Sequence, residues 1–119
     1  MEVGGYDSKY ITGAELTNVT IDNKTASYTL VLADANKLIE INNGSANTLG
    51  VPLNSTDAFP IGTQILVAQQ GAGQTTITPV SGVTLRSSGG KLKISAQYGI
   101  ATLIKRATDE WYVAGDLTT

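Results

Sequence analysis

Few residues of this chain could perform chemistry, and two of them are the adjacent carboxylates Asp109 and Glu110. A pair of carboxylates can cleave a glycosidic bond when the two groups face each other across a cleft. Adjacent residues of a strand point to opposite sides, so a hairpin turn explains this pair more simply. The chain has no histidine and no cysteine, which excludes thiol chemistry, Cys/His zinc sites and the usual general base near neutral pH. The sequence therefore predicts no enzyme, no metal site and no cofactor.

A glycine-rich segment, Gly71-Ala72-Gly73-Gln74-Thr75, contains half of the pattern of a phosphate-binding loop. It lacks the lysine that follows such a loop, and the change from strand to helix that turns backbone amides toward a phosphate. Glycine also supplies the positive φ angles that short turns demand. We therefore interpret the segment as a hairpin turn.

Surface aromatic and basic residues are the remaining candidates, and they would contact a partner. Trp111 and Tyr112 are adjacent in a predicted strand, so one is expected in the core and the other on the surface. A surface ring is either ordinary solvated surface or a contact for a sugar or a partner chain. The basic residues form either a solvated face or a surface for an acidic partner. The candidate partner contacts are Tyr6, Tyr10, Arg86, Lys91, Lys93 and Tyr112.

The composition indicates one small domain with a weakly charged surface. A chain of 119 residues buries roughly two thirds of the surface that its unfolded form exposes. Apolar residues make up 41%, which suffices for an aliphatic core, and charged residues make up 15%, below the roughly 25% of ordinary soluble domains. Thr, Ser, Asn, Gln and Gly take their place, as is common in β-rich proteins that sit in assemblies.

Charge is unevenly distributed along the chain. Residues 1–57 hold seven acidic residues and three lysines, a net charge of −4, whereas residues 58–108 hold five basic residues and no acid. Segments of opposite sign can pair within the fold or between copies. Five basic residues without an aromatic stacking pattern give little support for nucleic-acid binding, so no nucleic-acid partner is predicted.

The N-terminal residues do not form a secretion signal. Residues 1–10 lack the basic start and the apolar segment of a signal peptide, and no apolar run approaches the roughly 18 residues of a membrane span. We therefore expect a soluble protein that is made in a cytoplasm and has no membrane partner.

The stretch from Phe59 to Pro79 is predicted to form a buried hairpin around which the fold is organised. The first strand carries apolar side chains on both faces, with Ile65 and Val67 on one side and Leu66 on the other. This strand is therefore expected to be central and covered on both sides. The glycine turn then leads into a second strand rich in threonine.

Further short strands are expected before and after this hairpin, with a turn every 8–12 residues. They cover residues 27–32, 37–42, 48–53, 83–86, 91–94, 98–105 and 111–114. The strand at residues 98–105 is apolar on both faces, so it is a second candidate for a central strand. Pro52 places its strand at a sheet edge. The pattern predicts an all-β domain over residues 25–119, an antiparallel β-sandwich or jelly-roll-like barrel. Residues 1–24 are expected to form an extended N-terminal arm with at most one edge strand, although a frayed terminus is an equal alternative for residues 1–10.

Four segments, in this order, resemble a module that recurs in virion proteins of tailed bacteriophages. They are YTLVLADANKLIEINN, FPIGTQILVAQQGAGQTTI, SGVTLRSSGGKLK and QYGIATLIKRATDEWYVAGDL. The resemblance spans about residues 27–117 and leaves residues 1–26 outside it. The module occurs in small head proteins and at the ends of tail-fibre proteins.

The resemblance implies a virion structural protein that forms a homotrimer and has no catalytic residues. Because the chain begins at its own Met and holds little beyond the module, we expect a capsid decoration (cement) protein on the capsid surface. Such a protein would bridge capsomers by binding the major capsid protein and copies of itself, with the arm along a neighbour. The alternative is a tail-fibre or receptor-binding tip that recognises a host surface glycan.

Overall fold

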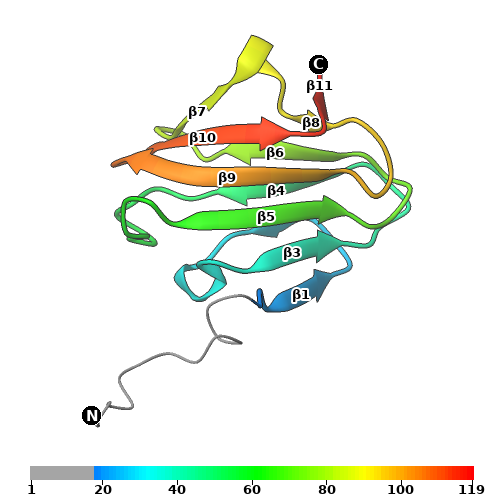
Figure 1. Ribbon diagram of the computed structural model, residues 1–119, viewed down its shortest axis with the longest axis horizontal. Helices are drawn as coiled ribbons and strands as arrows, with labels where there is room; N and C mark the ends of the chain where they lie inside the picture. Colours follow the sequence, from blue (N-terminus) through cyan, green and yellow to red (C-terminus); the bar gives the residue numbers. More distant parts are fainter. Residues whose placement is uncertain (1–17) are drawn as a thin grey trace, which may run out of the picture.

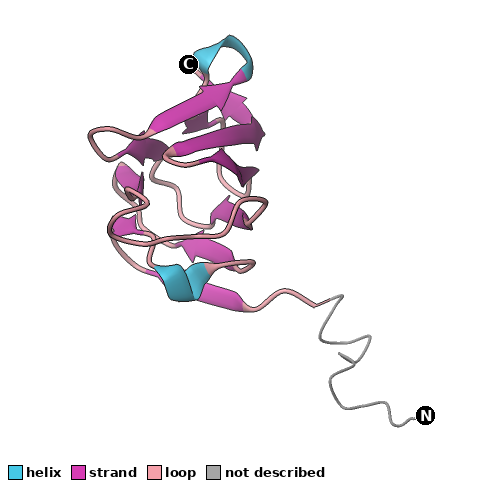
Figure 2. Cartoon of the chain, turned by 90° about the vertical axis from the view of Figure 1, so that its left-hand side faces the viewer, coloured by secondary structure: helices cyan, strands magenta, loops and turns pink. Residues whose placement is uncertain are grey.

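The computed structural model describes residues 18–119, which fold into two β-sheets that face each other across one core (Figures 1 and 2). The six-stranded sheet has the order β1 (Ile21–Lys24), β3 (Leu38–Ile41), β5 (Gln64–Gln69), β9 (Ile100–Ala107), β10 (Glu110–Gly115) and β7 (Thr84–Ser87). The five-stranded sheet has the order β11 (Leu117–Thr118), β8 (Lys93–Ile94), β6 (Thr75–Pro79), β4 (Asn47–Val51) and β2 (Tyr28–Thr29). Two short 3-10 turns, η1 (Leu32–Asp34) and η2 (Ser88–Gly90), lie between strands. The predicted all-β class and the sandwich are confirmed.

From β1 to β6 the chain alternates between the two sheets, and we call this region, residues 18–79, the parallel coil. β1, β3 and β5 pair in parallel in one sheet, and β2, β4 and β6 do so in the other. Neighbours in the second and third turns of the coil are 28 positions apart, as in the pairs Leu38–Leu66 and Asn47–Thr75. The predicted antiparallel pairing is wrong here, because a strand reached by crossing to the other sheet and back runs in the original direction.

The predicted hairpin at Phe59–Pro79 is also wrong, since its two strands belong to different sheets. β5 pairs with β3 and β9, whereas β6 pairs with β4 and β8. The turn between β5 and β6 packs against the earlier turn between β3 and β4. A Cβ atom at Gly73 would lie 2.0 Å from the carbonyl oxygen of Ser45, and the Gly73 amide donates to the carbonyl of Asn43 at 2.9 Å. The glycine therefore permits close stacking of two turns.

Buried polar side chains hold these stacked turns together. The Thr75 hydroxyl donates to Asn47 Oδ1 at 2.6 Å, and the Thr75 amide donates to Gln69 Oε1 at 3.1 Å. Asn47 Nδ2 in turn donates to the carbonyl of Ser45 at 3.0 Å. Because each buried group has a partner, burial carries no penalty for an unpaired dipole.

Residues 80–119 close the coil mainly with antiparallel strands. β9 lies between β5 and β10 and is antiparallel to both, and β8 is antiparallel to β6 and β11. The turn between β9 and β10 holds Asp109 at a φ of 56°, which confirms that Asp109 and Glu110 belong to a hairpin. β7 is the exception, because it runs parallel to β10.

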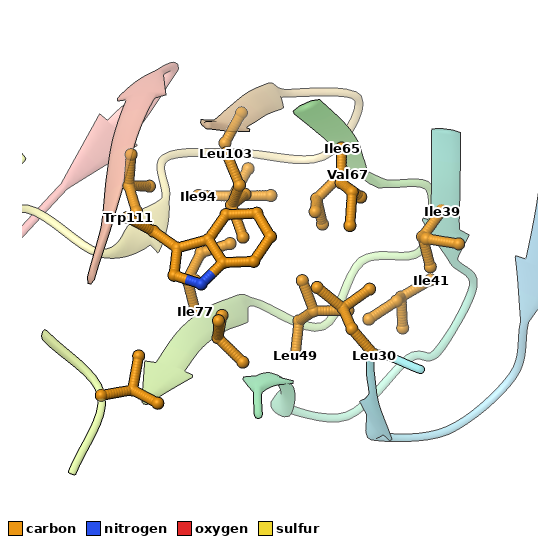
Figure 3. Close-up of a cluster of buried hydrophobic side chains, with 14 of the residues drawn as sticks. Leu30, Ile39, Ile41, Leu49, Ile65, Val67, Ile77, Ile94, Leu103 and Trp111 are labelled. Atoms are coloured by element: carbon orange, nitrogen blue, oxygen red, sulfur yellow. The ribbon is translucent and has the colours of Figure 1, made fainter. Parts of the chain in front are cut away.

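The core between the sheets is aliphatic and surrounds one large ring, Trp111 (Figure 3). The Phe59 ring packs edge-on against Trp111, with centroids 5.4 Å apart. Trp111 is 1% exposed and Tyr112 is 51% exposed, so the expectation of one core ring and one surface ring is confirmed. The buried aliphatic residues are Leu30, Ile39, Ile41, Leu49, Val51, Ile65, Val67, Ile77, Val83, Ile94, Ala101, Leu103 and Val113.

Two strand predictions need smaller corrections. β4 lies between β6 and β2, so it is not the edge strand that Pro52 suggested. Pro52 follows the last residue of β4, where no amide donor is needed for the ladder. The strand predicted at residues 27–32 is shortened to β2, because the chain turns into η1 at Leu32.

Most of the predicted arm lies outside the described residues, including Tyr6 and Tyr10. Within residues 18–24, Ile21–Lys24 form β1, which pairs with β3 at an edge of the six-stranded sheet. The described residues contain no helix long and apolar enough to cross a membrane.

Candidate interaction surface

The outer face of the six-stranded sheet carries apolar side chains that no described residue covers. Along β9, Ala101, Leu103 and Lys105 point into the core, and Ile100 and Ile104 point outward with 44% and 39% of their surface exposed. This sheet lies in front of the five-stranded sheet in Figure 1, so its outer face is turned toward the reader. The prediction that β5 and β9 are central strands is confirmed. The prediction that a second layer covers the outer face of β5 is not, because no described element packs on that face.

Strand register places these side chains on one face together with the half-buried Leu38 and Leu66, and the polar residues Gln64 and Thr102 lie among them. Ile104 lies opposite Tyr112 on β10 and Gln64 on β5, while Leu66 lies opposite Leu38 on β3. The patch reaches the edge strand through Ile21, which pairs with Leu38 and is 59% exposed. We call this patch the apolar face. Its members are Ile21, Leu38, Leu66, Ile100, Ile104 and Tyr112.

Charged groups of opposite sign lie at the two ends of the apolar face. At the β10–β7 end, Glu110 pairs with Arg86 at 2.8 Å and Arg106 at 2.9 Å, which leaves this cluster with a net charge of +1. The hydrogen bond from Arg86 is the largest influence that lowers the pKa of Glu110. The Arg106 guanidinium also lies 5.2 Å from the centre of the Tyr112 ring. At the β1–β3 end, Glu40 accepts a hydrogen bond from Asn23 at 3.3 Å.

A groove hollows the apolar face where β10 meets β7. It has a volume of about 490 Å³ and is lined by Arg86, Ser87, Ser88, Ile104, Tyr112, Val113 and Ala114. Among the described buried side chains, the Ser87 hydroxyl alone has no hydrogen-bond partner. A smaller hollow of about 200 Å³ follows beside Lys91 and Leu117. The groove combines a ring, an aliphatic side chain and a guanidinium, which are suited to binding a planar or partly apolar group.

The outer face of the five-stranded sheet has a different chemistry. Thr48 pairs with Thr76, and Gly50 lies between Thr29 and Thr78 in the register. A Cβ atom at Gly50 would come within 2.7 Å of the Thr29 hydroxyl oxygen, so the threonine side chain occupies the space above this glycine. Lys93 adds a charge opposite Thr76. This threonine face, formed by Thr29, Thr48, Thr76, Thr78 and Thr118, presents hydroxyl and methyl groups to solvent.

The structure separates the basic and aromatic residues that the sequence grouped as partner contacts. Arg86 and Tyr112 are neighbours across β7 and β10 on the apolar face. Lys93 lies on the threonine face, and Lys91 lines the smaller hollow. Ile100 and Ile104 were not predicted to be partner contacts. The signal that could have identified them is that their strand carries apolar residues on both faces.

Two buried charges, Asp34 and Lys105, have partners within the fold. Asp34 accepts hydrogen bonds from the Tyr28 hydroxyl at 2.7 Å and the Val31 amide at 2.9 Å. Burial, followed by this bond to Asp34, raises the pKa of Tyr28. Lys105 Nζ donates to Asn54 Oδ1 at 2.5 Å and to the Phe59 carbonyl at 2.8 Å. Both charges therefore fix neighbouring loops.

The acidic residues do not form a metal site in the described part of the chain. No group of three or more acidic side chains there could hold a metal ion. Asp109, the neighbour of Glu110, accepts a hydrogen bond from the Asn54 amide at 2.6 Å and so ties two loops together. The two members of this acidic pair thus have separate structural contacts.

No protein-family model matches the chain, and no curated protein matches it.

Proposed function

We propose that the protein is a virion structural protein of a tailed bacteriophage, a trimeric capsid decoration (cement) protein that stabilises the head by bridging capsomers. The observation that carries the proposal is the apolar face. Removal of apolar surface from water is the main force for protein association, and an exposed apolar patch is typical of a surface that meets another protein. The resemblance of residues 27–117 to the phage module is the reason for proposing that the assembly is a phage virion.

The proposed partners are copies of the chain and the major capsid protein, on the outer surface of the head. The apolar face serves self-association in this account, and the threonine face remains available to the capsid. Tyr6, Tyr10, Lys91 and Lys93 are the proposed capsid contacts, while Arg86 and Tyr112 belong to the contact between copies. The role is one of binding, and it requires no reaction and no cofactor.

Addition of the purified protein to empty capsids tests this function. We expect saturable binding, with hundreds of copies per particle, and capsids that resist heat or low ionic strength better than bare ones. A protein that stays in the supernatant at micromolar concentration when capsids are pelleted would contradict the proposal. Bovine serum albumin at the same concentration controls for trapped protein.

The groove beside Tyr112 favours a second candidate, a tail-fibre tip that binds a host surface glycan. An exposed ring next to a guanidinium can stack on a sugar and donate hydrogen bonds to its hydroxyls. Copy number separates the two functions, because decoration proteins coat the shell whereas fibres are few. Gel densitometry of intact particles, scaled to the major capsid protein, gives this number directly.

A further inference from the structure

We propose that the apolar face is where three copies of the chain meet, arranged head to tail around a three-fold axis, so that the Glu40 end of each face lies beside the Arg86–Arg106 end of the next. This inference rests on the proposed self-association and adds the surface and the arrangement. It follows from a contrast between the two outer faces and from the charges on one of them.

The difference in chemistry between the apolar face and the threonine face indicates which of them is buried between copies. Ile21, Ile104 and Tyr112 on the apolar face lose exposed hydrocarbon when another sheet covers them. The threonine face instead presents hydroxyl groups that bond to water, and each would need a new partner if covered. Self-association therefore gains most from the six-stranded sheet.

The charges identify a second copy as the occupant of this face. Among the outward side chains of β1 and β3, Glu40 is the charged one, and at the opposite end Arg86 and Arg106 exceed Glu110 by one positive charge. A second copy of the chain fits these charges when its Arg86–Arg106 end lies beside Glu40 of the first copy. A neighbouring copy supplies that complement without any other protein.

The three-fold symmetry is taken from the proposed function, since a two-fold dimer would also place each Glu40 beside an Arg86. In a ring of three, each Glu40–Arg86 contact joins two different patches of neighbouring copies, which is a heterologous contact. In a ring of three, each apolar face turns toward the axis, and the edge strand β1 of one copy approaches the edge strand β7 of its neighbour. Both edges are four residues long, and their unpaired backbone groups gain protection from this approach.

Cysteine pairs test the arrangement, because the chain has no cysteine of its own. We expect a short bis-maleimide to cross-link an equal mixture of Glu40→Cys and Arg86→Cys proteins into dimers, and to convert the Glu40→Cys/Arg86→Cys double variant into covalent trimers. Each single variant alone remains uncross-linked. Covalent dimers without trimers from the double variant would show a two-fold contact and overturn the head-to-tail arrangement, and so would cross-linking of Glu40→Cys by itself. A Thr48→Cys variant, which holds one cysteine on the threonine face, controls for random collisions between chains.

A matched pair of substitutions tests the choice of face. Ile104→Glu places a charge in the centre of the apolar face, and we expect light scattering to show a monomer at concentrations where the unaltered protein is a trimer. Thr78→Glu places the same charge on the threonine face and leaves the trimer intact. Circular dichroism melting of both variants shows whether either is unfolded. If Ile104→Glu fails to fold, Tyr112→Ser is the second variant, with the same expected loss of the trimer.

The outcomes separate this inference from the proposed function. A trimer that survives Ile104→Glu or Tyr112→Ser and is lost with Thr78→Glu overturns the inference, while capsid binding can still support the decoration role. An unaltered protein that is monomeric overturns both the inference and the proposed trimer. Trimers together with failed capsid binding overturn the decoration role and leave the inference supported.

Discussion

The two sheets of the sandwich differ most on the faces that point away from the core. The six-stranded sheet has Val67 and Leu103 inside, and its outer face exposes Ile100 and Ile104 among polar side chains such as Thr102. The five-stranded sheet is apolar only inside, and threonines cover its outer face. The proposed self-association uses this difference, because covering the outer face of the six-stranded sheet removes more apolar surface from water than covering the threonine face.

Substitutions on the inner and outer faces of β10 should differ most in their effect on folding stability. Trp111→Ala removes a fully buried ring that contacts Phe59, and we expect it to lower the free energy of unfolding by about 3–5 kcal/mol. Tyr112→Ala, the next residue on the opposite face, should cost less than about 1 kcal/mol of folding stability and act on association instead. Urea denaturation of each variant over a range of protein concentrations separates folding stability from association. Equal losses for the two variants would contradict the assigned faces.

The turn that joins the two sheets gives the next largest effect. Gly73→Ala forces a Cβ atom against the carbonyl of Ser45, which belongs to the backbone and cannot rotate away, and we expect a loss of about 3 kcal/mol. Gly44→Ala is the matched control, because its Cβ would meet no atom within 4 Å. The melting temperatures of the two variants, measured by thermal unfolding, give this difference in stability. A melting temperature for Gly73→Ala as high as that of Gly44→Ala would show that the turns do not stack as described.

Loss of the buried hydrogen bond between Thr75 and Asn47 should lower the folding stability somewhat less. Thr75→Val keeps the shape of the side chain but leaves Asn47 Oδ1 without its 2.6 Å hydrogen bond, at a cost of roughly 1–2 kcal/mol. Thr76→Val changes the neighbouring residue on the threonine face, where solvent replaces any lost bond, and should be nearly neutral. Urea unfolding compares them. Identical stability of the two variants would rule out a structural role for the buried pair.

The smallest expected effect concerns Tyr28 at alkaline pH. Its pKa is raised in the folded protein, so the unfolded chain ionises first, and stability falls as the pH rises above about 10, the ordinary value of tyrosine. Tyr28→Phe loses the bond to Asp34, about 1 kcal/mol near neutral pH, and also loses this alkaline component. The remaining tyrosines contribute equally to both proteins. Superimposable stability profiles between pH 8 and pH 11 would refute the assignment.

Sequence reasoning identified most strands but not their partners. Alternation in segments such as KLIEIN reveals a strand because side chains of a strand point to opposite sides, and β3 lies where it was predicted. The pairing of β5 with β3 depends on a contact between turns 28 residues apart, at Gly73 and Ser45. A glycine-rich turn has the same composition whether it closes a hairpin or crosses to another sheet, so the sequence could not distinguish these cases.

The candidate surface was predicted only in part. Arg86 and Tyr112 were identified as partner contacts, and the structure places them side by side on the apolar face. Ile100 and Ile104 were assigned to a doubly covered strand, because their pattern matches that of a strand buried on both sides. Such a pattern shows that a face is apolar, but it does not show whether the same chain or another one covers it.

Light scattering after size exclusion gives the molar mass of the unaltered protein at low micromolar concentration, and with it the number of copies that associate. We expect three times the 12.4 kDa of one chain, because the apolar face is buried between copies in the proposed trimer. A single species of 12.4 kDa at every concentration tested would contradict it.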